Sequence, residues 1–220
     1  MNPFDPANPF PLLPPDSHTY LEAQKHSAEV DHWLGIEVDK TEDVLSRTDQ
    51  PTRREHWLGL PAQTLLTPYT EIRYILSQLD PKPGERLTDL GAGYGRVGHV
   101  IGRHYPDVRF LGYECIRERF LEAERSLRFH NFPFAKMSLV DLNAPDFTPV
   151  QSDYYFIYDF GEREAIEKTL QDLRCIAQKK TITVIGRGRS SRDAIERQHP
   201  WLSQIINPQH CGHHSIYRSA

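Results

Sequence analysis

Acidic and glycine residues stand together in one short segment, residues 87–98, where their order suggests a ligand site. Asp89 comes late in an apolar run, and three glycines follow it at alternate positions, namely Gly91, Gly93 and Gly95. Glycine lacks a Cβ, so a glycine-rich turn lets the backbone approach a ligand, and a helix that starts there offers unpaired N–H groups. The segment therefore predicts a strand, a glycine turn and a helix, which is the nucleotide-cofactor geometry of open α/β sheets.

The same glycines fit two cofactor fingerprints. Residues 93–98 match G-x-G-x-x-G, the spacing of dinucleotide-binding turns, whereas residues 89–95 match D-x-G-x-G-x-G. Asp89 favours the second, because a carboxylate at the end of an apolar strand costs desolvation energy unless it meets a partner. A cationic group or the N–H groups of the loop would be such a partner, whereas a pyrophosphate would be repelled. The alternative is that Asp89 only caps the turn through its own backbone.

A second acidic residue lies at the expected distance from this loop. Residues 108–113 predict a strand that ends at Glu114, about 20 residues after the glycines. A carboxylate at that place accepts hydrogen bonds from two ribose hydroxyls, and both kinds of cofactor carry such a ribose. The alternative is a surface carboxylate at the end of a strand.

The elements that position these residues alternate along the rest of the chain. Apolar and aromatic runs predict strands, and apolar residues at helical spacing predict amphipathic helices. Beyond residue 114, strands are expected at residues 135–140, within 153–161, and at 181–186, 203–206 and 215–218. Helices are expected at residues 17–30, 41–47, from 72 to about 79, and at 116–130, 162–178 and 191–198.

Residues 89–95 resemble motif I of class I S-adenosylmethionine (SAM)-dependent methyltransferases, and the resemblance extends over residues 67–220. It implies a Rossmann-like α/β fold with a seven-stranded, mostly parallel sheet whose last strand is antiparallel. It also implies SAM as the cofactor and methyl transfer as the activity. Asp89 and the three glycines would hold the methionine part of SAM, and Glu114 would hold the ribose.

Two later aspartates receive roles by the same resemblance. Asp141 follows the predicted third strand, where the family contacts the adenine amino group, although an aspartate that forms a turn fits equally well. Asp159 follows the fourth strand and would border the methyl acceptor as a catalytic residue. Because Asp159-Phe160-Gly161 departs from the Asn-Pro-Pro-Tyr of the amide- and base-methylating subfamilies, a fold that binds without catalysis remains an alternative.

The segment Thr67-Pro68-Tyr69 is similar to one in non-SET protein-lysine methyltransferases. That similarity implies a protein lysine or another amine as acceptor, with Thr67 as a cofactor contact and Tyr69 as a catalytic residue at the acceptor. The alternative is a helix start at Pro68 followed by a packed tyrosine. An NAD-binding oxidoreductase is the other enzyme class that the glycine spacing leaves open.

The remaining sequence suggests how the chain is organised. Residues 1–16 are rich in proline and predict an extended or disordered tail, which could recruit a partner through its repeated Asn-Pro-Phe. Residues 17–66 predict a helical N-terminal addition, and residues 67–220 predict the methyltransferase domain.

Composition excludes several classes of function. The net charge of −4 argues against broad nucleic-acid binding, and no run among the 220 residues is long enough to span a bilayer. Three widely spaced cysteines and no signal peptide predict a cytoplasmic protein. The histidines at 210, 213 and 214 lack a second pair of ligands nearby, so no metal is expected, and Arg187, Arg189 and Arg192 predict a solvated loop.

Overall fold

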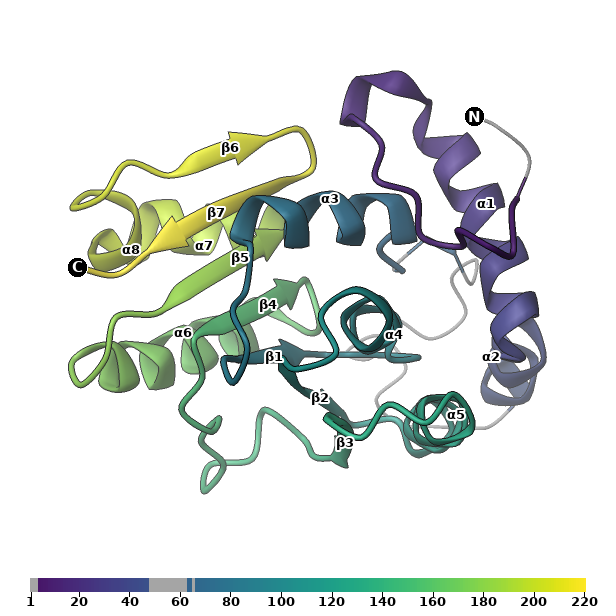
Figure 1. The fold of residues 1–220 in the computed structure, drawn as a ribbon. Helices are drawn as coiled ribbons and strands as arrows, with labels where there is room; N and C mark the ends of the chain where they lie inside the picture. Colours follow the sequence, from purple (N-terminus) through teal and green to yellow (C-terminus); the bar gives the residue numbers. More distant parts are fainter. Residues whose placement is uncertain (1–3, 48–62, 65) are drawn as a thin grey trace.

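A seven-stranded sheet with the order β3-β2-β1-β4-β5-β7-β6 forms the centre of the molecule (Figure 1). The computed structural model describes residues 4–47, 63–64 and 66–220. Between β3, at one edge, and β4, the chain crosses past β2 and β1, so that β4 pairs with β1 on its other side. The strands are β1 (Arg86–Leu90), β2 (Arg109–Glu114), β3 (Ala135–Leu139), β4 (Tyr154–Tyr158), β5 (Thr183–Arg187), β6 (Gln209–Cys211) and β7 (His214–Arg218).

The first five strands run parallel, and β7 pairs antiparallel with both β5 and β6. Parallel pairing brings the carboxyl ends of β1, β2, β4 and β5 to one edge, where ligands bind in open α/β sheets. This arrangement confirms the predicted seven-stranded, mostly parallel sheet with an antiparallel last strand.

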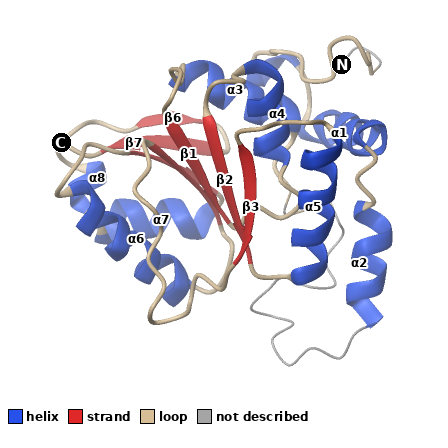
Figure 2. Cartoon of the chain, turned by 60° about the horizontal axis from the view of Figure 1, so that its bottom comes forward, coloured by secondary structure: helices blue, strands red, loops and turns tan. Residues whose placement is uncertain are grey.

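Helices cover both faces of the sheet (Figure 2). Side chains of successive strand residues point to opposite faces, so Leu87 packs with one layer of helices and Leu90 with the other. On the first face lie α3 (Tyr69–Leu79), α4 (Arg96–His104) and α5 (Arg117–Phe129). On the second face lie α6 (Arg163–Ala177), α7 (Arg189–Gln198) and α8 (Pro200–Ser203). None of the helices in the described ranges combines the length and the apolar character that a membrane crossing requires.

The strand predicted at residues 203–206 is wrong. Pro200 occupies the first position of α8, a place that suits proline because its missing N–H would be unpaired there anyway. Ile205 and Ile206 lie on the surface, 63% and 38% exposed, so these β-branched residues do not mark a buried strand. The chain joins the sheet later, at β6, where three residues pair with β7.

The N-terminal addition consists of α1 (Tyr20–Leu34) and α2 (Val38–Arg47), which lie outside the α3–α5 layer (Figures 1 and 2). Thr19 and Glu22 form a capping box at the start of α1, and Gly35 ends it in the left-handed conformation with φ 69°. Most of the predicted helical addition beyond residue 47, namely 48–62 and 65, lies outside the described residues.

Residues 4–16 form turns and bends that lead to a 3-10 helix at Pro15–Ser17, and the aromatic side chains of the segment are packed. Phe10 is 2% exposed. Its ring lies 5.1 Å from that of Tyr69 and 5.9 Å from that of His104. Phe4 packs between His26 and Trp33, with ring distances of 5.9 and 6.2 Å. Residues 4–16, which were predicted to be extended or disordered, contribute the side chain of Phe10 to the core.

We expect Phe10→Ala to lower the free energy of unfolding by about 3 kcal/mol, because it leaves a cavity in a packed aromatic cluster. Leu12→Ala is the matched control, since Leu12 is 51% exposed and its loss should change stability by less than about 0.5 kcal/mol. Denaturant unfolding of the three proteins measures both values. Equal stability of wild type and Phe10→Ala would contradict the packed arrangement.

Candidate functional site

The turn after β1 has the backbone that its glycines predict. Gly91, Gly93 and Gly95 have φ values of 94°, 54° and 73°, in the left-handed region that favours glycine. The N–H groups of Gly91 and Ala92 donate to the Tyr113 carbonyl at 3.0 and 2.8 Å, which ties the turn to β2. A Cβ on Gly91 would lie 2.4 Å from the Cβ of Phe160, so the end of β4 leaves room for glycine alone.

Glu114, at the end of β2, lies directly against this loop. Its Oε2 accepts a hydrogen bond from the Gly93 N–H at 2.8 Å, and its Oε1 accepts one from the Ile116 N–H at 2.8 Å. Glu114 is 5% exposed. The structure therefore brings together the glycine loop and the carboxylate that the sequence predicted to act with it.

Asp89 occupies a different environment from Glu114. It is 5% exposed, and its carboxylate has no hydrogen-bond partner among the residues that the structure describes. Burial, together with the nearby charge of Glu114, raises the pKa of Asp89 to about 8. At neutral pH the carboxyl group is therefore mostly protonated, and a cation placed beside it would favour the ionised form. The turn-capping alternative lacks any hydrogen bond within the described part of the chain.

Two residues of the loop region are anchored to the N-terminal helices. The hydroxyl of Tyr94, which is 1% exposed, donates to Glu42 Oε1 at 2.7 Å. Glu42, on α2, also accepts from Arg119 Nε at 2.7 Å and from Arg119 Nη2 at 3.0 Å. Arg119 lies in the first turn of α5, so α2 connects the glycine loop with the helix that follows Glu114.

Arg96, the first residue of α4, makes the second anchor. Its guanidinium donates to Asp31 on α1, with Nε 3.2 Å from Oδ1 and Nη2 bonded to Oδ2. Nη1 donates to the Thr67 carbonyl at 3.1 Å, and Nη2 donates to Gln63 Oε1 at 2.7 Å. The side chains of Arg96 and Asp31 are each 4% exposed, so this is a buried ion pair with several hydrogen bonds. This ion pair was not predicted from the sequence.

Thr67 and Tyr69 belong to this buried network. Thr67 is 7% exposed and Tyr69 is 0% exposed. The Tyr69 hydroxyl donates to Asp31 Oδ1 at 2.8 Å, and the Arg96 guanidinium lies 5.0 Å from the centre of its ring. Tyr69 was predicted to border the acceptor, but a hydroxyl enclosed in this way is not available to one. We therefore assign Tyr69 to the packing of α3 against α1, and Pro68, not Thr67, is the cap residue of α3.

Asp159 also has a partner that the sequence did not suggest. Its Oδ1 accepts from the N–H and the hydroxyl of Ser191, both at 2.8 Å, and its Oδ2 accepts from the Ser190 N–H at 3.3 Å. These groups form the first turn of α7, so the carboxylate caps that helix from the end of β4. Asp159 has φ 28°. The predicted catalytic carboxylate is thus engaged with α7, and we regard it as a positioning residue.

Asp141 lies at the surface and forms the turn that the sequence left as an alternative. Its Oδ1 accepts from the Asn143 N–H at 2.8 Å. It is also close enough to Cys115 to help raise the pKa of that thiol, after the larger effects of burial and Glu114. Asp141 therefore follows β3 at the same edge of the sheet where Glu114 ends β2. The hydrogen bond of the turn uses Oδ1 and not Oδ2.

Arg187 contradicts the expectation of a solvated loop. Its guanidinium is 3% exposed, and it donates to Glu71 from Nε at 3.1 Å and from Nη2 at 3.0 Å. It lies 4.0 Å from the centre of the Tyr158 ring. Burial opposes ionisation of Glu71, but His214 and Arg187 outweigh it and lower its pKa to about 2. No group of three or more metal-ligating side chains occurs in the described ranges.

Several solved structures share this architecture. A SAM-dependent methyltransferase from Aquifex aeolicus is similar with a TM-score of 0.52 and 13% identity, over 83% of this chain and 97% of that one. A TehB-like SAM-dependent methyltransferase from Corynebacterium glutamicum has a TM-score of 0.50 and 14% identity, over 68% and 86%. TrmN from Thermus thermophilus has a TM-score of 0.50 and 17% identity, over 78% and 54%. No protein-family model and no curated protein matches the sequence.

The chain therefore has the fold of class I SAM-dependent methyltransferases, as the resemblance of its glycine segment implied. At these identities the likeness concerns the fold. The glycine loop, Asp89 and Glu114 lie at the carboxyl ends of β1 and β2, the edge where such folds bind ligands.

We expect Asp31→Asn to lower the free energy of unfolding by about 3 kcal/mol, because it leaves the Arg96 guanidinium buried without its counter-ion. Asp43→Asn removes an exposed pair with Arg47, in which the aspartate side chain is 71% exposed. This control should cost no more than about 0.5 kcal/mol. Chemical denaturation compares the two variants, and similar losses for both would contradict the structural importance of the buried pair.

The raised pKa of Asp89 makes stability depend on pH. The folded protein holds the proton that the unfolded chain releases near pH 3.8, so the free energy of unfolding falls as pH rises from there to about 8. Asp89→Asn lacks this loss, because an amide resembles the protonated acid and does not ionise. The free energy of unfolding of Asp89→Asn minus that of wild type should therefore be larger at pH 9 than at pH 5. The same stability difference at both pH values would refute the shifted pKa.

Proposed function

We propose that this protein is an enzyme that uses SAM to methylate an acceptor. The observation that carries the proposal is the buried Asp89 carboxyl group, which has no partner within the described residues and lies beside the glycine loop and Glu114. In this fold such a group suits the cationic amine and sulfonium of SAM. The fold of the methyltransferases from Aquifex aeolicus and Corynebacterium glutamicum supports the same reading.

The residues present fit the cofactor at three points. Gly91, Gly93 and Gly95 give a backbone that a ligand can approach closely, and Asp89 would pair with the amine of the methionine part. Glu114 would accept hydrogen bonds from the ribose hydroxyls, for which it must share or release its bond to the Gly93 N–H. Asp141 remains the candidate for the adenine amino group through the oxygen that its turn does not use. Thr67 is too buried to touch the cofactor unless this region rearranges.

The chain contributes to the reaction mainly by positioning. When bound, SAM supplies an electrophilic methyl group, and transfer then needs alignment of donor and acceptor and exclusion of water. Asp159 fixes the end of β4 to the start of α7, so it holds Tyr158 and Phe160 at the edge where an acceptor would enter. The Tyr158 hydroxyl donates to the Thr64 carbonyl at 3.1 Å, which orients this aromatic wall.

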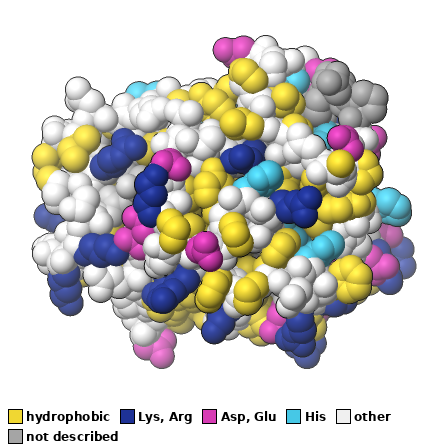
Figure 3. Space-filling view, in the orientation of Figure 1, with side chains coloured by type: hydrophobic (Ala, Val, Ile, Leu, Met, Phe, Trp, Pro, Cys, Tyr) yellow, Lys and Arg dark blue, Asp and Glu magenta, His cyan; other side chains and the backbone are white. Residues whose placement is uncertain are grey.

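We propose an amine as the acceptor, either on a protein lysine or on a small molecule. The aromatic side chains of Tyr158 and Phe160, at the end of β4, support it, because aromatic rings can stabilise a cation. Lys, Arg, Asp and Glu side chains are interspersed over the face in Figure 3, so this face offers no continuous basic surface to a nucleic acid. The three cysteines, which form no disulfide, support a cytoplasmic location.

Two alternatives make different predictions. An NAD-dependent oxidoreductase would bring a pyrophosphate to the glycine loop, where it would favour the protonated form of Asp89 and give that residue no cation to pair with. A protein that binds SAM without catalysis would keep the loop contacts and lack transfer. Its only support is the engagement of Asp159 with α7.

Calorimetric titration with SAM, S-adenosylhomocysteine and NAD tests the cofactor. We expect micromolar binding of both adenosyl ligands and no binding of NAD. Glu114→Ala should weaken SAM binding by roughly 100-fold, because two charge-assisted hydrogen bonds to the ribose are lost. Glu124→Ala is the control, since Glu124 pairs with Arg128 on the surface of α5, and the affinity of this variant should match wild type.

The outcomes of these titrations distinguish the three proposed functions. NAD binding alone would overturn the proposal, and unchanged SAM affinity in Glu114→Ala would remove the ribose assignment. If SAM binds, labelled SAM on a cell lysate then distinguishes an active methyltransferase, which labels an acceptor, from a fold that only binds.

A further inference from the structure

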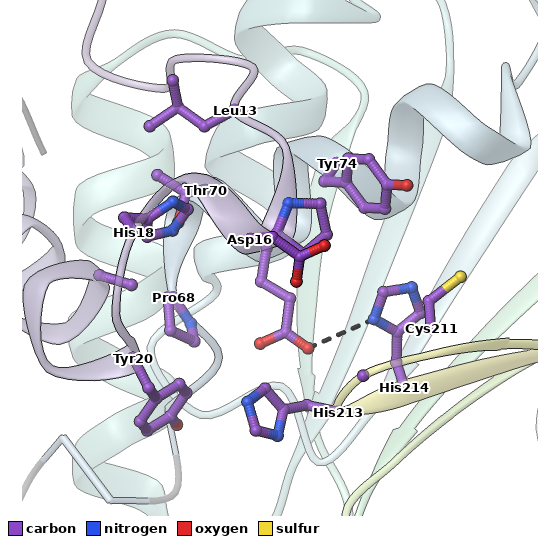
Figure 4. A pocket seen from close by; sticks show the side chains of 14 residues that line it. Leu13, Asp16, His18, Tyr20, Pro68, Thr70, Tyr74, Cys211, His213 and His214 are labelled. Atoms are coloured by element: carbon purple, nitrogen blue, oxygen red, sulfur yellow. Dashed lines mark hydrogen bonds and ion pairs between the residues drawn. The ribbon is translucent and has the colours of Figure 1, made fainter.

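A pocket opens between the N-terminal segment and the β6–β7 hairpin (Figure 4), and its lining does not include the glycine loop. Its volume is about 140 Å³, which is smaller than a typical small-molecule site. Three parts of the chain far apart in sequence build it: residues 13–23, the first turns of α3, and the hairpin residues 211–214. Folding therefore assembles this pocket from distant segments, and it is not a groove along one element.

The polar groups of the pocket are acidic or neutral. Asp16 and Glu71 line it, and none of its fourteen lining residues is a lysine or arginine. Asp16 is exposed, and its carboxylate has no hydrogen-bond partner in the described part of the chain. Tyr20 and Tyr74 add aromatic rings, and the Tyr20 ring lies 5.2 Å from that of His213 across the pocket mouth. Carboxylates beside aromatic rings recognise ammonium groups.

His214 adds an unexplained buried group to the same wall. It is 2% exposed, and its Nδ1 lies 3.4 Å from Glu71 Oε1, the contact that Figure 4 marks with a dashed line. A neutral imidazole whose Nδ1–H faces this carboxylate presents Nε2 as an acceptor. Nε2 has no hydrogen-bond partner among the described residues, and an unpaired buried acceptor is costly. A ligand that donates a hydrogen bond would satisfy it.

The histidine on the opposite wall does not oppose a cation. His18 lies with Nε2 3.2 Å from Thr70 Oγ1 and Nδ1 3.0 Å from Ser17 Oγ, so both ring nitrogens are engaged. Burial, which outweighs the attraction of Glu22, lowers the pKa of His18 and keeps its ring neutral at neutral pH. Arg187 neutralises Glu71 from the sheet side, which leaves Asp16 as the uncompensated charge of the pocket.

We propose that this pocket binds the ammonium group of an alkylamine, with Asp16 as counter-ion and His214 Nε2 as hydrogen-bond acceptor. The amine is either a free small molecule or the side chain of a lysine in a peptide, which present the same alkylammonium. The site does not depend on SAM. It lies at the same sheet edge as the glycine loop, with His214 paired to Arg187 at the end of β5.

Calorimetry on the full chain without SAM tests the proposal with two probes, 1,5-diaminopentane and a short peptide with one central lysine. Their neutral controls are 1-pentanol and the same peptide with norleucine in place of lysine. We expect saturable binding of at least one amine probe and none of its neutral control. Asp16→Asn should weaken that binding about fivefold, because one carboxylate near the ammonium is lost. Asp39→Asn removes the same charge from the exposed face of α2 and should bind as wild type does.

Nitrogen NMR of the His214 ring supplies a second readout that does not depend on any variant. The Nε2 resonance should move when an amine probe saturates the pocket and stay fixed with the neutral control. Binding of the diamine alone assigns the pocket to small molecules, and binding of the peptide alone assigns it to protein lysines. The proposal is overturned by no amine binding, by equal binding of neutral controls, by an unchanged affinity in Asp16→Asn, or by a fixed Nε2 resonance. None of these outcomes bears on SAM binding.

Discussion

The buried ion pair between Asp31 and Arg96 is the interaction on which the arrangement of the site depends. Arg96 is the first residue after the glycine loop, and Asp31 belongs to the N-terminal addition, so the pair joins the loop to a part of the chain outside the sheet. Breaking such a pair leaves a charge in a low-dielectric interior, which costs far more than losing a surface pair. The loop is thereby held in one place by α1, and Tyr94 and Glu42 hold it to α2 in the same way.

Glu71 and Asp89 are two acidic residues whose surroundings give them opposite protonation states. Around Glu71 the carboxylate is paired with Arg187 and lies beside His214, and these contacts keep it ionised although it is buried. Around Asp89 the nearest charge is Glu114, and burial leaves the group holding a proton. Glu71 has its counter-ion within the protein. Asp89 has none, so a bound cation would stabilise its ionised form. This difference distinguishes a structural ion pair from a site that receives a ligand.

The sequence predicted what local periodicity and motif order encode. The alternation of strands and helices, the glycine turn and Glu114 at the end of β2 follow from such patterns, and all are present. It did not predict contacts between distant residues: Asp159 caps a helix 32 residues away, and Tyr69 donates to a residue 38 positions earlier. Thr-Pro-Tyr starts a helix in the same way whether the tyrosine faces a cleft or the core. Short elements were also misplaced, since residues 203–206 have strand-forming isoleucines and lie at the surface.

The separation of Asp31 and Arg96 along the chain also has a consequence for synthesis on the ribosome. Asp31 emerges 65 residues before its partner, and Phe10 emerges long before the Tyr69 ring on which it stacks. Until α3 and α4 have been made, α1 carries an unpaired carboxylate and the preceding segment exposes its aromatic side chains. Phe10 and Asp31 therefore complete their native contacts only after later segments emerge, and this interval is when chaperones would have most surface to bind.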